Sequence, residues 1–310
     1  MGTFYRNAFL IYNPQAGGLT RARSHRIHRA LELLRSLGHT VRETPTTHAH
    51  HATELAREAA AAGADLVIAA GGDGTINEIA NGLAGTQTPL AILPAGTANV
   101  LANEMRLSGG IRQAARSLHT LVPRRITLGL FRPLYGQPRH FLLMAGAGFD
   151  ADIVRRVDPN LKRRLGKGAY WIATLSRLGA RLPQIDLTVN GDRLQTGFAL
   201  AARVRNYGGD LEIARNVTLL DHDFEIAAFP GHTTWPYGYY MGAIVLGAQQ
   251  HLSGVYWKRG DALDLAPVNG DDIYVQLDGE LAGQLPGRFE TVPDSLTLLT
   301  PPDLPHRYSR

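Results

Sequence analysis

Ala69-Ala70-Gly71-Gly72-Asp73-Gly74-Thr75-Ile76-Asn77-Glu78 is the stretch that decides the fold of this chain of 310 residues. The apolar run Leu66–Ala70 leads into it and is typical of a buried strand, and apolar residues then recur at helical spacing. A strand, a glycine-rich loop and a helix form a phosphate cradle, because glycines let backbone N–H groups approach an oxyanion and adopt positive φ. The Asp73 carboxylate would repel phosphate unless a cation lay between them. The stretch therefore predicts a nucleotide phosphate bound with Mg²⁺.

The same residues are also compatible with a plain strand-to-helix turn. Thr75 and Glu78 fit a capping box, in which side chains satisfy the N–H groups at a helix start. Two more strands favour the cradle: one runs into the polar stretch Pro94–Asn99 and the other into Asn13–Gly18. Parallel strands of an open α/β sheet end at the same edge, so we expect the three loops to gather there.

Strand and helix patterns alternate up to about Leu121, which predicts a three-layer α/β domain with a parallel sheet. The expected strands are 8–12, 40–46, 66–70 and 90–93, with helices near 21–37, 52–62, 76–83 and 100–105.

After Pro123 many short strand patterns follow, which predicts a mainly antiparallel β-sandwich domain. Asn190-Gly191 is a strong hairpin signal. The expected strands are 125–131, 141–145, 185–189, 198–204, 217–220, 224–229 and 273–277, with helical insertions in 150–182 and 235–252.

These motifs together resemble the diacylglycerol kinase and sphingosine kinase catalytic-domain family, close to the bacterial lipid kinases. The resemblance covers nearly the whole chain in the right order: Asn13-Pro14, Gly17-Gly18, Gly71–Glu78, Leu93–Asn99, Gly148–Ala151 and Asp278-Gly279-Glu280. It implies a nucleotide-binding domain at 1–123, onto which 296–310 packs back, and a lipid-acceptor domain at 124–295. The nucleotide is expected between the two domains.

The expected nucleotide contacts come from the predicted loops. They are Gly71, Gly72, Asp73, Gly74, Thr75, Asn77 and Glu78 from the first cradle, Gly96, Thr97 and Asn99 from the second, and Asn13. Thr46 is added by the resemblance alone.

The catalytic carboxylates are expected in Asp278-Gly279-Glu280, where the intervening glycine lets both side chains enter one space and tune one pKa. The resemblance places the proton acceptor here; we expect Glu280 to be the base, Asp278 to orient it or share its role, and Asp73 to be a third catalytic residue. The motif also fits an ordinary Asp-Gly turn after a strand.

A magnesium-linked Asp-Asp-Gly motif is typical of the family. This chain has Leu220-Asp221-His222-Asp223 in its place, so Asp221, Asp223 and Thr218 are the metal candidates. His222 replaces the usual glycine, which puts full activity in doubt. His48, His50 and His51 also cluster, but with no carboxylate or cysteine seen at ligand spacing we expect a solvated loop.

Composition excludes disulfides, thiolate metal sites and cysteine nucleophiles, since the chain has no cysteine. The net charge of +5 favours anionic partners. Six basic residues between Arg155 and Lys167, followed by Tyr170 and Trp171, fit either contact with anionic lipid or a solvated helix and loop. We expect a cytoplasmic protein at the inner membrane face, with no nucleic-acid partner and an open oligomeric state.

The function expected is an ATP- and Mg²⁺-dependent lipid kinase of phospholipid metabolism, acting on a diacylglycerol-like or sphingoid-like hydroxyl. Two alternatives stay open. NAD kinases share Gly-Gly-Asp-Gly-Thr, and a lipid-binding relative without strong turnover would account for His222.

Overall fold

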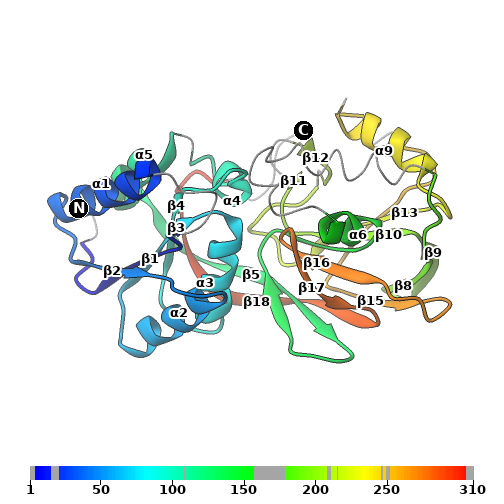
Figure 1. Ribbon diagram of the computed structural model, residues 1–310, viewed down its shortest axis with the longest axis horizontal. Coiled ribbons are helices and arrows are strands. Elements are labelled where there is room, and N and C mark those ends of the chain that lie inside the picture. The colour runs from blue at the N-terminus through cyan, green and yellow to red at the C-terminus, as the bar shows by residue number, and fades with distance from the viewer. Residues whose placement is uncertain are drawn as a thin grey trace. The chain divides into compact units, whose positions relative to one another are not determined.

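The computed structural model describes residues 4–14, 21–107, 109–156, 179–207, 211–214, 216–245, 247–248 and 252–304. The chain folds into two compact units (Figure 1). Unit 1 consists of Met1–Leu128 and Pro293–Pro305, and unit 2 contains Gly129–Val292. The long strands β5 (Val122–Pro133) and β18 (Gly287–Thr300) each have residues in both units.

Unit 1 contains a parallel sheet in the order β2-β1-β3-β4, and Leu298 of β18 pairs in parallel with Leu90 of β4. The strand bounds are β1 Ala8–Tyr12, β2 Val41–Pro45, β3 Leu66–Gly71 and β4 Leu90–Pro94. Every residue of β3 and β4 is buried, as expected for strands covered on both faces. The order reverses between β1 and β3, so the sheet has its switch point there, where open α/β sheets bind ligands.

Helices cover both faces of this sheet (Figure 1), with α1 and α5 on one face and α2 and α3 on the other. Ile27, Ala30, Leu31 and Leu34 of α1 are buried, as their spacing predicts. The helix bounds are α1 Arg21–Ser36, α2 His51–Ala61, α3 Asp73–Leu83, α4 Val100–Glu104 and α5 Gly110–Ser117, followed by the 3₁₀ turn η1 Leu118–Thr120.

Unit 2 is built on an antiparallel sheet in the order β14-β13-β10-β7-β16-β17. A second group pairs β15 with β8 and β8 with β9, both antiparallel, and side chains of both groups share one core that includes Ile185, Phe224 and Val275. The bounds are β6 Arg139–Phe141, β7 Met144–Gly148, β8 Ile185–Val189, β9 Asp192–Thr196, β10 Phe198–Ala202, β11 Asn206–Tyr207, β12 Leu211–Glu212, β13 Phe224–Phe229, β14 Tyr256–Gly260, β15 Ala262–Pro267, β16 Tyr274–Leu277 and β17 Glu280–Gln284. This architecture confirms the predicted fold class.

In unit 2 the predicted hairpin is confirmed, and two of the predicted strands differ from the structure. The hairpin signal is right: Asn190 and Gly191 have φ of 49° and 87° and connect β8 to β9. The strand predicted over 217–220 is wrong, because that segment is a turn held by the Thr218 and Asp221 side chains. The strand predicted over 141–145 divides between β6 and β7.

Two helices of unit 2 lie in the predicted insertions, α6 (Phe149–Arg156) and α9 (Trp235–Val245). Residues 157–178, which include most of the basic segment with Tyr170 and Trp171, lie outside the described residues. Within the described ranges, none of the helices is long and apolar enough to cross a membrane.

Candidate active site

A pocket of about 220 Å³ lies in unit 1, at the switch point of the parallel sheet. It contains four of the predicted nucleotide contacts, which come from the loops after β1 and β2 and from α3. Its lining residues are Asn13, Thr46, Thr47, His48, Ala49, Ala52, Thr75 and Glu78. The loop after β2 contributes more of this lining than the sequence indicates, since only Thr46 is predicted there.

The two glycine loops of unit 1 are joined to each other through backbone contacts. A Cβ atom on Gly96 would lie 2.5 Å from the Gly72 Cα atom, and Ala95 N–H donates to the Gly71 carbonyl at 2.9 Å. None of Gly71, Gly72, Gly74 and Gly96 has positive φ, so that part of the prediction is wrong. Gly72 and Gly96 are required because their loops approach so closely that side chains cannot fit, and a Cβ atom on Gly71 would lie 2.7 Å from the Thr75 Cβ atom.

Asp73 connects the same loops through its side chain. Its carboxylate accepts hydrogen bonds from the backbone N–H groups of Val100 and Leu101, at 3.1 and 3.2 Å, at the start of α4. Burial raises the pKa of Asp73, and these backbone hydrogen bonds oppose the shift. The carboxylate therefore holds the second loop against the first.

Asn99 shapes the second loop. With φ of 48°, it accepts the Gly96 N–H through Oδ1 at 2.7 Å and donates through Nδ2 to the Gly96 carbonyl at 3.0 Å. Thr97 is exposed on this loop, whereas Asn77 is 1% exposed inside α3 and accepts a hydrogen bond from Asn81. The structure thus places Asn77 away from the pocket lining.

The N-terminus of α3 carries no side-chain cap. The predicted capping box is wrong, because the helix already begins at Asp73, so that Thr75 and Glu78 both lie inside it. Glu78 instead accepts the Ala52 N–H at 3.3 Å, at the start of α2. The first turn of α3, with Gly74 and Thr75, therefore presents backbone N–H groups and partial positive charge toward an anion.

The Asp278-Gly279 pair forms the turn between β16 and β17, with φ of 51° and 85°. The Asp278 carboxylate accepts three backbone N–H groups, those of Leu142, Leu143 and Met144, at 2.8 to 3.0 Å. The turn interpretation is therefore right for these two residues. Asp278 is a positioning residue that fixes where the turn lies.

Glu280, the first residue of β17, differs from Asp278 because its carboxylate is partly exposed and pairs with a side chain. Its side chain is 43% exposed and its Oε2 atom lies 2.8 Å from Nη2 of Arg139, whose side chain is 21% exposed. The ion pair orients the carboxylate and leaves part of it exposed to solvent.

Two buried polar side chains, Asp150 and Gln276, form a series of hydrogen bonds that ends at this turn. Asp150 accepts a hydrogen bond from Nε2 of Gln276 at 2.7 Å, and Oε1 of Gln276 accepts the Gly279 N–H at 2.7 Å. Burial raises the pKa of Asp150 to about 7, although the Gln276 hydrogen bond opposes the shift. Asp150 belongs to the quoted Gly148–Ala151 motif but had no predicted role; a carboxylate two residues after an all-buried strand was the available signal.

Two of the three metal candidates, Asp221 and Asp223, pair with Arg259, and the third, Thr218, donates hydrogen bonds to Asp221. Asp221 accepts from the Thr218 N–H at 3.0 Å and lies 2.9 Å from Nη2 of Arg259, which also forms an ion pair with Asp223. Burial raises the pKa of Asp223, but the hydrogen bond and charge of Arg259 outweigh this, so the net pKa is lowered. Arg203, fully buried, donates to the Asp223 carbonyl at 3.0 Å. A divalent cation at these carboxylates would have to displace the Arg259 guanidinium.

This arrangement predicts a cation dependence that appears only when the arginine is removed. Arg259→Gln is expected to lower the free energy of unfolding by about 1–3 kcal/mol, because two close carboxylates lose their counterion in a partly exposed site. Millimolar Mg²⁺ or Ca²⁺ should then raise the melting temperature of the variant more than that of the wild type. Arg288→Gln is the matched control, since Arg288 pairs with Asp264 and Glu290 on the surface. Equal cation responses of Arg259→Gln and the wild type would contradict the interpretation.

The geometry defines a class of protein: an α/β unit with a phosphate-type cradle at its switch point, and a β-sandwich unit that presents an oriented carboxylate. The diacylglycerol kinase catalytic domain family matches residues 7–131. Diacylglycerol kinase of Mycobacterium tuberculosis (strain ATCC 25618 / H37Rv) is 30% identical over 88% of this chain and 89% of its own length. A Pseudomonas putida protein named "Probable lipid kinase YegS-like" is 30% identical over 92% of this chain and 94% of its own length.

A crystal structure of a diacylglycerol kinase from Bacillus anthracis str. Sterne has the same fold, with a TM-score of 0.77, 22% identity and coverage of 97% of this chain and 99% of that chain. The chain belongs to the diacylglycerol kinase catalytic-domain family. The predicted family and the predicted enzyme class, a lipid kinase, are thereby confirmed.

Proposed function

We propose that this enzyme transfers the γ-phosphoryl group of ATP, bound with Mg²⁺, to the hydroxyl group of a diacylglycerol-like or sphingoid-like lipid. The observation that carries the phosphate part is the α3 N-terminus, which has no side-chain cap and begins beside two glycine loops in contact. Diacylglycerol kinases of Bacillus subtilis (strain 168) and M. tuberculosis among the relatives support a lipid acceptor.

The first step for this chain is to bind phosphate. Backbone N–H groups of Gly74 and Thr75, in the first turn of α3, fit the phosphate oxygens, and the joined loops keep these donors from moving. Asn13, Thr46 and Thr75 supply polar side chains in the same pocket. ATP with Mg²⁺ would supply the phosphoryl group and the cation that offsets its charge.

The second step is to remove the proton of the acceptor hydroxyl. Glu280 is the proposed base, since it is the exposed carboxylate of the motif and Arg139 orients it. Asp278 keeps the turn in place through its three backbone hydrogen bonds and therefore acts on Glu280 by position.

The lipid acceptor is proposed to be reached at an anionic membrane surface. Trp235 and Tyr239 lie four residues apart on α9 and are 68% and 60% exposed, which suits insertion at a lipid interface. Of the basic segment, Arg155 and Arg156 are described, and both form ion pairs with Asp152. Their charge is therefore partly offset, so the aromatic pair on α9 is the better support for lipid contact. We also propose a cytoplasmic location, which suits a chain without cysteine, and no nucleic-acid partner.

The proposal is tested with labelled ATP, MgCl₂ and purified protein against diacylglycerol and sphingosine in vesicles of neutral or anionic lipid, and against NAD. We expect label in a lipid product, faster with anionic vesicles, and loss of label when Mg²⁺ is chelated. Label in NADP would favour the NAD kinase alternative. Absence of label in every acceptor, with the protein folded, would favour a lipid-binding relative without turnover.

A further inference from the structure

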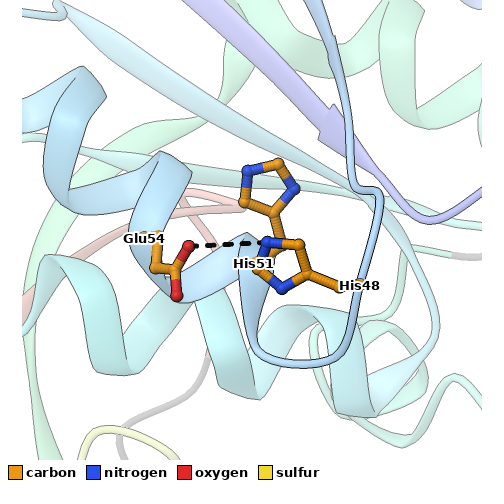
Figure 2. A group of neighbouring side chains, drawn as sticks. All are labelled: His48, His51 and Glu54. Atoms are coloured by element: carbon orange, nitrogen blue, oxygen red, sulfur yellow. Dashed lines mark ion pairs between the residues drawn. The ribbon is translucent and has the colours of Figure 1, made fainter.

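A cluster of metal-ligating side chains lies beside the pocket, in the turn that leads into α2. His48, His51 and Glu54 each offer one ligand atom, and these atoms all lie within 4.8 Å of one another. Figure 2 shows the two imidazole rings beside the carboxylate, with the ion pair of His48 and Glu54 dashed; Nε2 and Oε2 are 3.8 Å apart. Glu54 supplies the carboxylate at ligand spacing whose apparent absence led to the expectation of a solvated loop.

Local backbone geometry produces this cluster. His51 and Glu54 lie three residues apart in the first turn of α2, so their side chains share a face. His50 has φ of 62°, a left-handed conformation that turns the chain back on itself. The His48 ring consequently stacks on the His51 ring, with centroids 4.3 Å apart and an angle of 19° between the planes. His50 is outside the cluster, but its conformation brings the other residues together.

Each ring also has a partner that orients it. Nδ1 of His48 lies 3.0 Å from the Ala49 carbonyl, which only accepts, so Nδ1 is the donor there and Nε2, beside Glu54, is the nitrogen available to a metal. Nδ1 of His51 lies 3.1 Å from the Thr47 hydroxyl and 3.0 Å from the Thr47 nitrogen. In the structure Nδ1 accepts the Thr47 N–H, so ligation through Nε2, which places the ring proton on Nδ1, requires that N–H to turn away while the Thr47 hydroxyl accepts the proton. Such hydrogen bonds from the distal nitrogen are typical of metal-bound histidines.

We propose that His48, His51 and Glu54 bind one transition-metal ion of the Zn²⁺ class, with water as the fourth ligand. Two imidazoles and a carboxylate favour Zn²⁺, Ni²⁺ or Cu²⁺ over Mg²⁺, which prefers oxygen ligands only. Ligands of a tetrahedral zinc ion lie roughly 3.3 Å apart at bond lengths of about 2.0–2.1 Å, so binding draws the three together. The His48 and Glu54 side chains are 55% and 54% exposed and can make this movement.

A metal at this site is expected to change the affinity of the pocket for nucleotide, an expectation that rests on the proposed function. His48 also lines the pocket, so a bound metal fixes its ring at the pocket rim. Metal and nucleotide are therefore expected to alter each other's affinity.

The experiment measures metal binding itself, on tag-free full-length protein after treatment with a chelator. Zn²⁺ is titrated against a chromophoric indicator, and Co²⁺ is titrated while the visible absorption of a tetrahedral complex is recorded. We expect one site per chain with a micromolar dissociation constant. His48→Ala and Glu54→Gln should each weaken Zn²⁺ binding at least about 10-fold, because a ligand is lost in each case.

Two controls make the result specific. His50→Asn removes the neighbouring imidazole with a residue that tolerates left-handed backbone, and His28→Ala removes the histidine of an exposed His–Glu pair on α1. Both should bind Zn²⁺ as the wild type does. Absence of stoichiometric binding, or binding that His48→Ala and Glu54→Gln leave unchanged, would overturn the site. Binding of an ATP analogue with and without Zn²⁺ then tests the link to the pocket separately, so the metal site stands or fails without the kinase proposal.

Discussion

Replacement of Glu280 by glutamine is expected to lower kcat by at least about 100-fold, with little change in the KM for ATP, because glutamine keeps the shape of the side chain but cannot accept a proton. Stability should change little, since an ion pair in which Glu280 is 43% exposed contributes less than about 1 kcal/mol. Steady-state kinetics with the lipid acceptor and thermal denaturation measure both quantities.

Glu290→Gln is the matched control for this variant. Glu290 pairs with Arg132 at 2.6 Å, as Glu280 pairs with Arg139, but it lies on β18, away from the Asp278-Gly279 turn. The control should keep wild-type kcat. If Glu280→Gln turns over at a rate near that of the wild type, Glu280 is not the base, and the proton must leave by another route.

The second large effect is a change in the pH dependence of stability on replacing Asp150 by asparagine. The pKa of Asp150 is about 7 in the folded protein and 3.8 as its ordinary value, so folding takes up a proton between these values. Stability from this group is fully present below about pH 4 and falls as the pH rises toward 7. A shift of about three units corresponds to roughly 4 kcal/mol at most. Asparagine is neutral at every pH, so the variant does not lose this stability as the pH rises.

We therefore expect the unfolding free energy of Asp150→Asn, relative to the wild type, to rise by about 2–4 kcal/mol between pH 4 and pH 8. Urea unfolding at four pH values measures this difference. Asp271→Asn, at an exposed position, is the control and should follow the wild type at every pH. A difference between Asp150→Asn and the wild type that is constant with pH would show that Asp150 is not held protonated by burial.

The core elements of unit 1 could be predicted because their patterns are local. β1, β3 and β4 are apolar runs that end in glycine-bearing loops, and α1 shows one apolar face. Those signals need no knowledge of distant partners. β14 and β15 of unit 2 gave no such signal: Lys258 and Arg259 on β14 pair with Asp192 and Asp223, which are far away in sequence. Cross-strand charge pairs of this kind appear only once the strands are assembled.

The candidate site likewise has features that the sequence shows locally and features that depend on tertiary contacts. The glycine loops were visible in the sequence, but the reason for their glycines, the contact of Gly72 with Gly96, is a tertiary one. The capping box was predicted wrongly because α3 begins at Asp73, two residues before Thr75. Glu78 accepts a hydrogen bond from α2 instead, and this partner lies 26 residues away in sequence. The spacing of His51 and Glu54 could have indicated a ligand pair, whereas the fold-back of His48 depends on one left-handed residue.

The last strand segment of unit 1 comes from the far end of the chain, where Leu296, Leu298 and Leu299 are completely buried and Leu298 pairs with Leu90. During translation the first 128 residues leave the ribosome with the outer edge of β4 uncovered and its apolar groups in water. Unit 1 consequently cannot reach its final structure until Pro293–Pro305 have been synthesised. An excised N-terminal fragment should aggregate rather than fold, even though it holds nearly the whole stretch that matches the family.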